Sequence, residues 1–116
     1  MITGIDHFAI IVSSDDTLKF YQKLGFVEYY RKVRQYDTVV LLNGFGIRLE
    51  CFIDDKHPQR CIPEPLGLRH IAFKVDNIEK TLKELEIKDA ETSYDWVGTR
   101  YAFIKDSDYN IVELHE

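Results

Sequence analysis

An internal repeat constrains the fold of this chain more than any other feature of the sequence. Residues 4–12, GIDHFAIIV, align without a gap with residues 67–75, GLRHIAFKV, so that a glycine, a histidine, an alanine and a valine coincide. His70 therefore follows His7 by 63 residues. Self-similarity at a fixed period is typical of a chain that uses one supersecondary unit more than once. We expect two structurally equivalent modules.

Each module shows the same order of elements. A strand comes first, and Ser13–Asp16 and Asp76–Asn77 then supply candidate N-caps for a helix. Gly25 is placed to end the first helix, and Asn43-Gly44 is a typical hairpin turn. Three further strand-like runs complete each module, which gives the order β-α-β-β-β twice. The expected strands cover residues 5–12, 27–33, 38–42 and 47–53 in the first module, and 68–75, 93–97, 101–105 and 111–115 in the second.

The prolines locate the boundary between the modules. All three lie between Asp54 and Pro65, and no other stretch reads as a connector. We expect a single domain over residues 1–116, with a first module at 1–53, a connector at 54–66 and a second module at 67–116. Each module should form a curved mixed sheet with its helix on the convex side, an α+β architecture in which the two sheets face each other across a cleft.

Composition excludes several classes of function. Lys and Arg number 15 against 20 Asp and Glu, so a net charge of −5 leaves no basic surface for duplex DNA or anionic lipid. No apolar run approaches the roughly 20 residues that span a bilayer. No signal peptide is visible, and the two cysteines form neither a C-x-x-C pair nor a disulfide framework. We therefore expect a cytoplasmic protein that acts on a small molecule, with no nucleic-acid or membrane partner.

Four polar residues fall on the faces of the strands that point away from the helices. Side chains alternate along a strand, and the apolar residues that suit packing against a helix have the opposite parity in each case. The two glutamates are separated by the same 63 residues as the two histidines. Carboxylates that face an interior must be paired or bound to a metal, and two of them beside two imidazoles indicate a divalent cation. The predicted ligands are His7, Glu50, His70 and Glu113.

Other side chains near these positions carry weaker indications. Arg48 shares a face with the first glutamate and would hold either an anionic group of a substrate or a ligand carboxylate. Tyr101 and Phe103 would line the pocket or belong to the core, and His115 would reach the rim of the site or lie in solvent. Cys51 has the parity of the helix-packed face, which predicts a buried thiol.

Two motifs, together with the repeat, resemble the vicinal oxygen chelate superfamily, also called the glyoxalase/bleomycin resistance/dioxygenase superfamily. The stretch Phe20–Phe26, FYQKLGF, is similar to a signature common in that family. The segment Asp106–Leu114, DSDYNIVEL, looks like the family's D-P-D-G-N-x-x-E-L, with Ser107 and Tyr109 in place of the proline and the glycine. The resemblance covers nearly the whole chain. It implies the tandem-module fold and a metal ligand at Glu113.

Within that superfamily, the order His-Glu-His-Glu looks most like lactoylglutathione lyase, glyoxalase I. This likeness implies that the same four residues bind Zn²⁺, Ni²⁺, Co²⁺, Mn²⁺ or Fe²⁺. It also implies isomerisation of a small oxygen-chelating substrate, for example the hemithioacetal of a 2-oxoaldehyde and a low-molecular-weight thiol. Proton transfer through an enediolate would use Glu50 and Glu113 as catalytic bases. No arginine follows His7 of the kind that helps to hold the glutathione carboxylate in the bacterial enzyme, so the identity of the thiol stays open.

Other members of the superfamily define the alternatives. A metal-free ligand-binding protein of the bleomycin-resistance kind does not need all four residues. A ring-opening dioxygenase or a fosfomycin-type thiol transferase uses two histidines and one glutamate and leaves Glu50 unexplained, and an epimerase acting on a thioester would be expected to show a coenzyme A motif. Resembling proteins are usually homodimers with C2 symmetry. We expect this assembly, with the cleft formed within one chain or across two.

Overall fold

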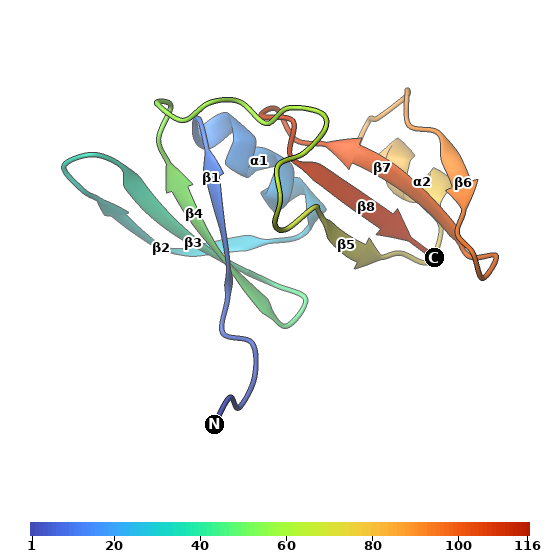
Figure 1. The fold of residues 1–116 in the computed structure, drawn as a ribbon, viewed down its shortest axis with the longest axis horizontal. Coiled ribbons are helices and arrows are strands. Elements are labelled where there is room, and N and C mark those ends of the chain that lie inside the picture. Colours follow the sequence, from blue (N-terminus) through green and yellow to red (C-terminus); the bar gives the residue numbers. More distant parts are fainter. The chain divides into compact units, whose positions relative to one another are not determined.

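The computed structural model describes residues 1–116 and divides them into two compact units, Met1–Pro58 and Gln59–Glu116. The boundary falls inside the proline-containing connector at residues 54–66. Each unit contains four strands and one helix in the order β-α-β-β-β (Figure 1). The α+β class and the tandem modules predicted from the sequence are therefore confirmed.

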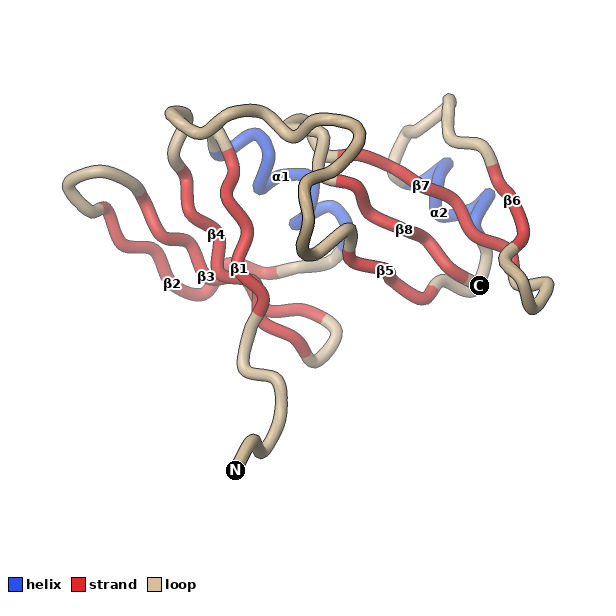
Figure 2. Tube along the Cα trace, viewed as in Figure 1, coloured by secondary structure: helices blue, strands red, loops and turns tan.

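The first unit is a mixed four-stranded sheet with one helix (Figure 2). The strands lie in the order β1-β4-β3-β2, in which β1 and β4 are parallel and the other neighbours are antiparallel. Val12, Val40, Leu42, Leu49 and Cys51 lie buried in this unit. The elements are β1 (Phe8–Val12), α1 (Asp15–Leu24), β2 (Val27–Val33), β3 (Thr38–Gly44) and β4 (Ile47–Ile53).

The second unit repeats this topology with the strand order β5-β8-β7-β6. Again the first and last strands of the module, β5 and β8, are parallel neighbours, and the other pairs are antiparallel. Ala102, Ile104, Val112 and Leu114 form part of its core. The elements are β5 (Ile71–Lys74), α2 (Ile78–Glu84), β6 (Thr92–Tyr94), β7 (Arg100–Lys105) and β8 (Ile111–His115).

The two sheets preserve the register of the sequence repeat. Ala9 pairs with Glu50 across β1 and β4, and Ala72 pairs with Glu113 across β5 and β8. These are the same positions separated by 63 residues in the alignment. Each glutamate therefore lies beside the strand that starts just after a repeated histidine.

Helix α1 begins and ends at the residues that the sequence predicts. Ser14 is the N-cap, and its Oγ accepts a hydrogen bond from the backbone N–H of Asp16 at 3.2 Å. Gly25 ends the helix with a φ of 125°, a conformation that favours glycine. Leu18 and Tyr21, one helical turn apart, are fully buried. Capping and burial of one face together account for the helix.

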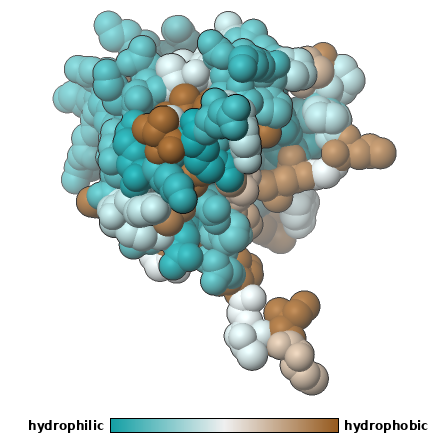
Figure 3. Space-filling view, turned by 90° about the vertical axis from the view of Figure 1, so that its left-hand side faces the viewer, coloured by the Kyte–Doolittle hydropathy of each residue, from teal (hydrophilic) through white to brown (hydrophobic).

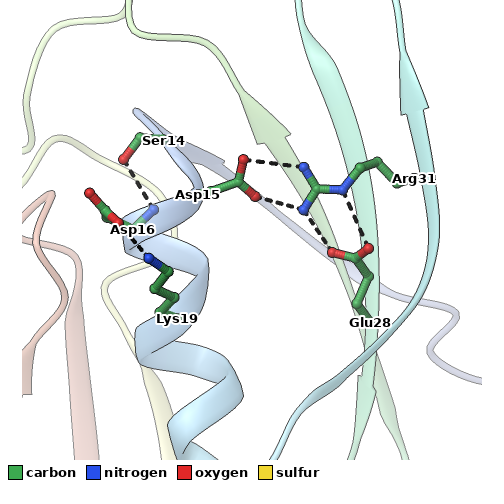
Figure 4. Close-up of polar contacts among 6 residues, drawn as sticks. All are labelled: Ser14, Asp15, Asp16, Lys19, Glu28 and Arg31. Carbon is green, nitrogen blue, oxygen red and sulfur yellow. Dashed lines mark hydrogen bonds and ion pairs between the residues drawn. The ribbon is translucent and has the colours of Figure 1, made fainter.

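Arg31 ties the edge strand β2 to the first turn of α1 (Figure 4). Its guanidinium donates two hydrogen bonds to the Asp15 carboxylate, at 2.6 and 3.2 Å, and two to Glu28, at 2.7 and 3.3 Å. This hydrogen bonding holds the pKa of Asp15 below its usual value.

The side of the molecule that carries β2 is largely hydrophilic, with isolated hydrophobic patches (Figure 3).

The turn between β3 and β4 differs from the prediction. Asn43-Gly44 continues β3, with Gly44 paired to Ile47, and the turn itself is Phe45-Gly46, with φ values of 55° and 75°. Gly44 is required for a different reason, because a Cβ there would lie 2.8 Å from the ring of Phe26. The two-residue turn therefore lies two residues later than predicted.

Several strands are shorter than predicted. The first strand of each module begins three residues later than the sequence suggests, so His7 and His70 lie just before β1 and β5. Strand β6 ends at Tyr94, whereas the sequence predicts strand up to residue 97. Neither helix is long and apolar enough to cross a membrane.

Candidate metal centre

The first pair of predicted ligands meets on the open face of the first sheet. His7 precedes β1, Glu50 occupies the middle of β4, and the two strands are parallel neighbours. The Nε2 atom of His7 lies 2.8 Å from Oε2 of Glu50. Both side chains are partly exposed, at 38% and 26%, so an ion or a small molecule can reach them from solvent.

The neighbours of Glu50 along β4 point the other way. Leu49 and Cys51 are fully buried, as the alternation of side chains along a strand predicts. Burial raises the pKa of the Cys51 thiol to about 12. Since a thiol must lose its proton to bind a metal, Cys51 is a core residue and not a ligand. The prediction of a buried thiol is confirmed.

The second pair of predicted ligands has the same arrangement in the second unit. The Nε2 atom of His70 lies 3.7 Å from Oε2 of Glu113, and their side chains are 25% and 15% exposed. Val112 and Leu114, on either side of the glutamate, are buried. The Nδ1 atom of His70 is buried and has no hydrogen-bond partner. The repeat thus builds two histidine–glutamate pairs from the same strand positions.

Two aromatic rings lie on the ligand-bearing face of the second sheet. Phe103 pairs with Glu113 across β7 and β8, and its ring centroid lies 5.4 Å from that of His70 in an edge-to-face contact. The ring of Tyr101 is 5.3 Å from that of Phe103. Residues of the opposite parity on β7 fill the core. Tyr101 and Phe103 therefore lie on the face of the sheet that carries His70 and Glu113, and not in the core.

Arg48 contacts a carboxylate that the sequence analysis did not single out. Its Nη1 lies 3.4 Å from Oδ1 of Asp6, and its guanidinium lies over the ring of Tyr29 at 5.9 Å. The structure pairs Arg48 with Asp6 and not with Glu50, the predicted ligand that shares its strand face. Hydrogen bonding to His7 and the charge of Arg48 lower the pKa of Asp6. Asp6 adjoins the repeated histidine, which was the signal available in the sequence.

His115 is neither a free chain end nor a member of the ligand pairs. Its Nε2 lies 3.1 Å from Oδ2 of Asp95, in the loop after β6. The other oxygen of Asp95 accepts hydrogen bonds from the backbone N–H groups of Val97 and Thr99. These contacts, with the bond from Thr99 the strongest cause, lower the pKa of Asp95. His115 therefore anchors a loop.

The residues of the two pairs suit a divalent ion. Imidazole nitrogen and carboxylate oxygen are common ligands of first-row transition metals. Two atoms that each lie about 2.1 Å from one ion are about 3.0–3.4 Å apart, and the observed separations of 2.8 and 3.7 Å bracket that range. Neither unit by itself holds three or more His, Cys, Asp or Glu side chains suited to a metal.

The fold defines a class of protein built from tandem β-α-β-β-β modules. The family model of the Glyoxalase/Bleomycin resistance protein/Dioxygenase superfamily matches residues 4–114. The chain belongs to this superfamily, and the resemblance found in its sequence motifs is confirmed.

Relatives of similar length share more than a third of the sequence. The uncharacterized protein YwkD of Bacillus subtilis (strain 168) is 38% identical, with 100% of this chain and 98% of YwkD covered. The uncharacterized protein YaeR of Escherichia coli (strain K12) is 36% identical, with 97% and 95% covered.

Solved structures show the same fold. The glyoxalase family protein from Enterococcus faecalis has a TM-score of 0.87 and 37% identity, with 97% of each chain covered. The fosfomycin resistance protein FosX from Listeria monocytogenes has a TM-score of 0.77 at 20% identity, covering 99% of this chain and 94% of FosX. At that identity the likeness shows the fold alone. One FosX structure is complexed with Mn(II) and 1S,2S-dihydroxypropylphosphonic acid.

Proposed function

We propose that this chain is a metal-dependent lyase or isomerase of the glyoxalase I type. The observation that carries the proposal is the histidine–glutamate pair that the fold builds twice, with nitrogen–oxygen distances of 2.8 and 3.7 Å. Membership of the superfamily supports an enzyme of this kind. The substrate class we propose is a small molecule with two adjacent oxygens, such as the hemithioacetal of a 2-oxoaldehyde and a thiol.

A divalent ion would be held by one imidazole and one carboxylate from each unit. His7 and Glu50 would bind from the first unit, and His70 and Glu113 from the second. When bound, such an ion polarises a substrate carbonyl and makes the neighbouring C–H group more acidic. This function gives both glutamates a role, whereas chemistry that uses two histidines and one glutamate gives Glu50 none. We therefore prefer this function.

The two glutamates are the groups suited to move the proton. Each lies in the middle of a strand, beside an imidazole and on the open face of its sheet. One carboxylate would take the proton from one carbon, and that proton, passed to the equivalent carboxylate through the enediolate oxygens, would return to the neighbouring carbon. Around Glu113 the rings of Phe103 and Tyr101 would reduce the access of water, so that the proton is exchanged with the carboxylate rather than with solvent.

Arg48 is the residue we propose for binding an anionic group of the substrate or of its thiol. Its side chain is 43% exposed, and its contact with Asp6 is long, at 3.4 Å. Stacking over Tyr29 holds the guanidinium near the open face of the sheet without using its hydrogen-bond donors. Such a residue can bind a carboxylate at little loss of existing contacts.

Metal content and metal-dependent turnover test the proposal together. The purified protein should contain a divalent metal by mass spectrometry, and EDTA should remove both the metal and the activity. Methylglyoxal would be offered with several low-molecular-weight thiols after reloading with Ni²⁺ and Zn²⁺ in turn. Return of activity on reloading supports the enzyme. A protein that binds no metal but still binds a small ligand would contradict it and favour the bleomycin-resistance kind of binding protein.

We also propose that the protein is a C2 homodimer in a reducing cytoplasm. Closed two-fold assembly is the commonest form of homo-oligomer, and both cysteines, Cys51 and Cys61, are free thiols. Light scattering during gel filtration should give the mass of two chains of 13.7 kDa. A single-chain mass at micromolar concentration would contradict the dimer.

A further inference from the structure

His7 lies between two carboxylates. Its Nδ1 atom is 2.8 Å from Oδ1 of Asp6, and its Nε2 atom is 2.8 Å from Oε2 of Glu50. Asp6 itself is held from the other side, because Nη1 of Arg48 lies 3.4 Å from the same Oδ1 atom. The imidazole ring is thereby constrained at both nitrogens.

A neutral imidazole cannot donate a hydrogen bond to both carboxylates, because it carries a single N–H group. If Nδ1 carries the hydrogen and donates it to Asp6, the lone pair of Nε2 faces the Glu50 carboxylate. That arrangement leaves Nε2 free to share a cation with the carboxylate. Histidines that bind metals commonly donate their other N–H to a carboxylate, which fixes the ring and raises its basicity.

The second module lacks this feature. The residue that corresponds to Asp6 in the repeat is Arg69, which pairs with Glu64 at 3.3 Å. The Nδ1 atom of His70 is buried without a hydrogen-bond partner. The two histidine–glutamate pairs are therefore unequal, and only the first has a carboxylate that orients its imidazole.

We infer that Asp6 is a positioning residue that holds His7 with Nδ1 protonated and Nε2 free for the metal, so that the first pair is the preorganised half of the site. This inference rests on the metal centre proposed above. It predicts that Asp6, which is not itself a ligand, affects metal affinity, whereas Arg69, the equivalent residue of the second module, does not. Since Asp6 is exposed and lies outside the strands, its replacement leaves the core packing unchanged.

The tautomer of His7 can be measured in metal-free protein. Long-range proton–nitrogen correlation spectra of the histidine rings, recorded at pH 8, should show Nδ1 as the protonated nitrogen of His7 in the wild type. Asp6→Ala should shift the ring toward the Nε2-protonated form. Asp6→Asn should retain the wild-type tautomer, because its amide oxygen still accepts from Nδ1. Arg69→Ala is the matched control at the corresponding position and should leave His7 unchanged.

Metal affinity is the second measurement. Titration calorimetry with Mn²⁺ and with Ni²⁺ should show that Asp6→Ala raises the Kd about 10- to 100-fold. Asp6→Asn should lie closer to the wild type, and Arg69→Ala should stay within two-fold of it. This inference alone would be overturned if the wild type binds an ion tightly and Asp6→Ala changes the Kd by less than two-fold. It would also be overturned if His7 of the wild type is protonated at Nε2. Failure of the wild type to bind either ion would overturn it together with the proposed function.

Discussion

The imidazole of His7 and the carboxylate of Glu50 lie 2.8 Å apart because β1 and β4 are parallel neighbours in register. The same register recurs in the second unit, where the corresponding pair lies 3.7 Å apart. Parallel strands cannot be joined by a short hairpin. The contact therefore depends on the whole module between the two residues, including the helix and two intervening strands.

Removal of any of the four proposed ligands should weaken metal binding. His7→Ala and His70→Ala each delete a nitrogen ligand, and Glu50→Gln and Glu113→Gln keep the volume while removing a charge. We expect metal content after dialysis to fall well below that of the wild type in all four, measured by mass spectrometry. The added stability of the metal-loaded protein, about 2.7 kcal/mol at a free ion concentration of 100 times the Kd, should decrease with it in thermal unfolding.

His57→Ala is the control for this series. His57 lies 3.3 Å from Asp54 near the end of the first unit and belongs to neither ligand pair, so its loss should leave metal content and activity unchanged. Full metal occupancy in the His70→Ala protein would refute a site that uses both modules.

Glu113→Gln should lower turnover by more than its loss of metal explains. If Glu113 exchanges the substrate proton, an amide in its place binds the substrate but cannot accept that proton. We expect a fall in kcat of about 100-fold or more at saturating metal, with a small change in KM. Steady-state kinetics over a range of metal concentrations separates the two effects. A loss of activity that excess metal restores fully would make Glu113 a ligand only.

The ion pair between Asp15 and Arg31 should make stability depend on pH in the acidic range. The hydrogen bonds from Arg31 lower the pKa of Asp15 below 3.8 in the folded state, so the pair stabilises the fold above that pH. The contribution is lost as the pH falls through the lowered folded value. Asp15→Asn should therefore destabilise the protein more at pH 7 than at pH 2.

The expected size of that effect is small, because the Asp15 side chain is 58% exposed. Exposed pairs contribute about 0.2–1 kcal/mol and are screened by salt. Urea unfolding at pH 7 and pH 2, with and without 1 M NaCl, measures it. Arg31→Gln should give at least the same loss at pH 7, because it also removes the hydrogen bonds to Glu28. Equal destabilisation by Asp15→Asn at both pH values would contradict the assignment.

Gly44→Ala should destabilise the first unit although Gly44 does not form the turn. The added Cβ would come within 2.8 Å of the buried ring of Phe26, and overpacking of this kind costs about 1–3 kcal/mol. Chemical denaturation measures the difference. Gly4→Ala is the matched control, since a Cβ there meets nothing within 4 Å. Equal stability of Gly44→Ala and the wild type would show that Phe26 moves freely.

The sequence by itself predicted much of what is local in this fold. Ser14 and Gly25 mark the ends of α1, because caps act on backbone groups within a few residues. Alternation along β4 placed Glu50 on the open face and Cys51 in the core. The spacing of the repeat predicted that Glu113 would take the corresponding place in the second sheet.

Only the tertiary structure decided features that depend on contacts between distant residues. The ring of Phe26 lies so close to Gly44 that it excludes a side chain there, and the turn forms at Phe45-Gly46 rather than at Asn43-Gly44. The link between Asp6 and Arg48 follows from the pairing of β1 with β4. Capping and strand alternation depend only on residues that are close in the sequence. Packing and ion pairing depend on which strands the folded chain brings together.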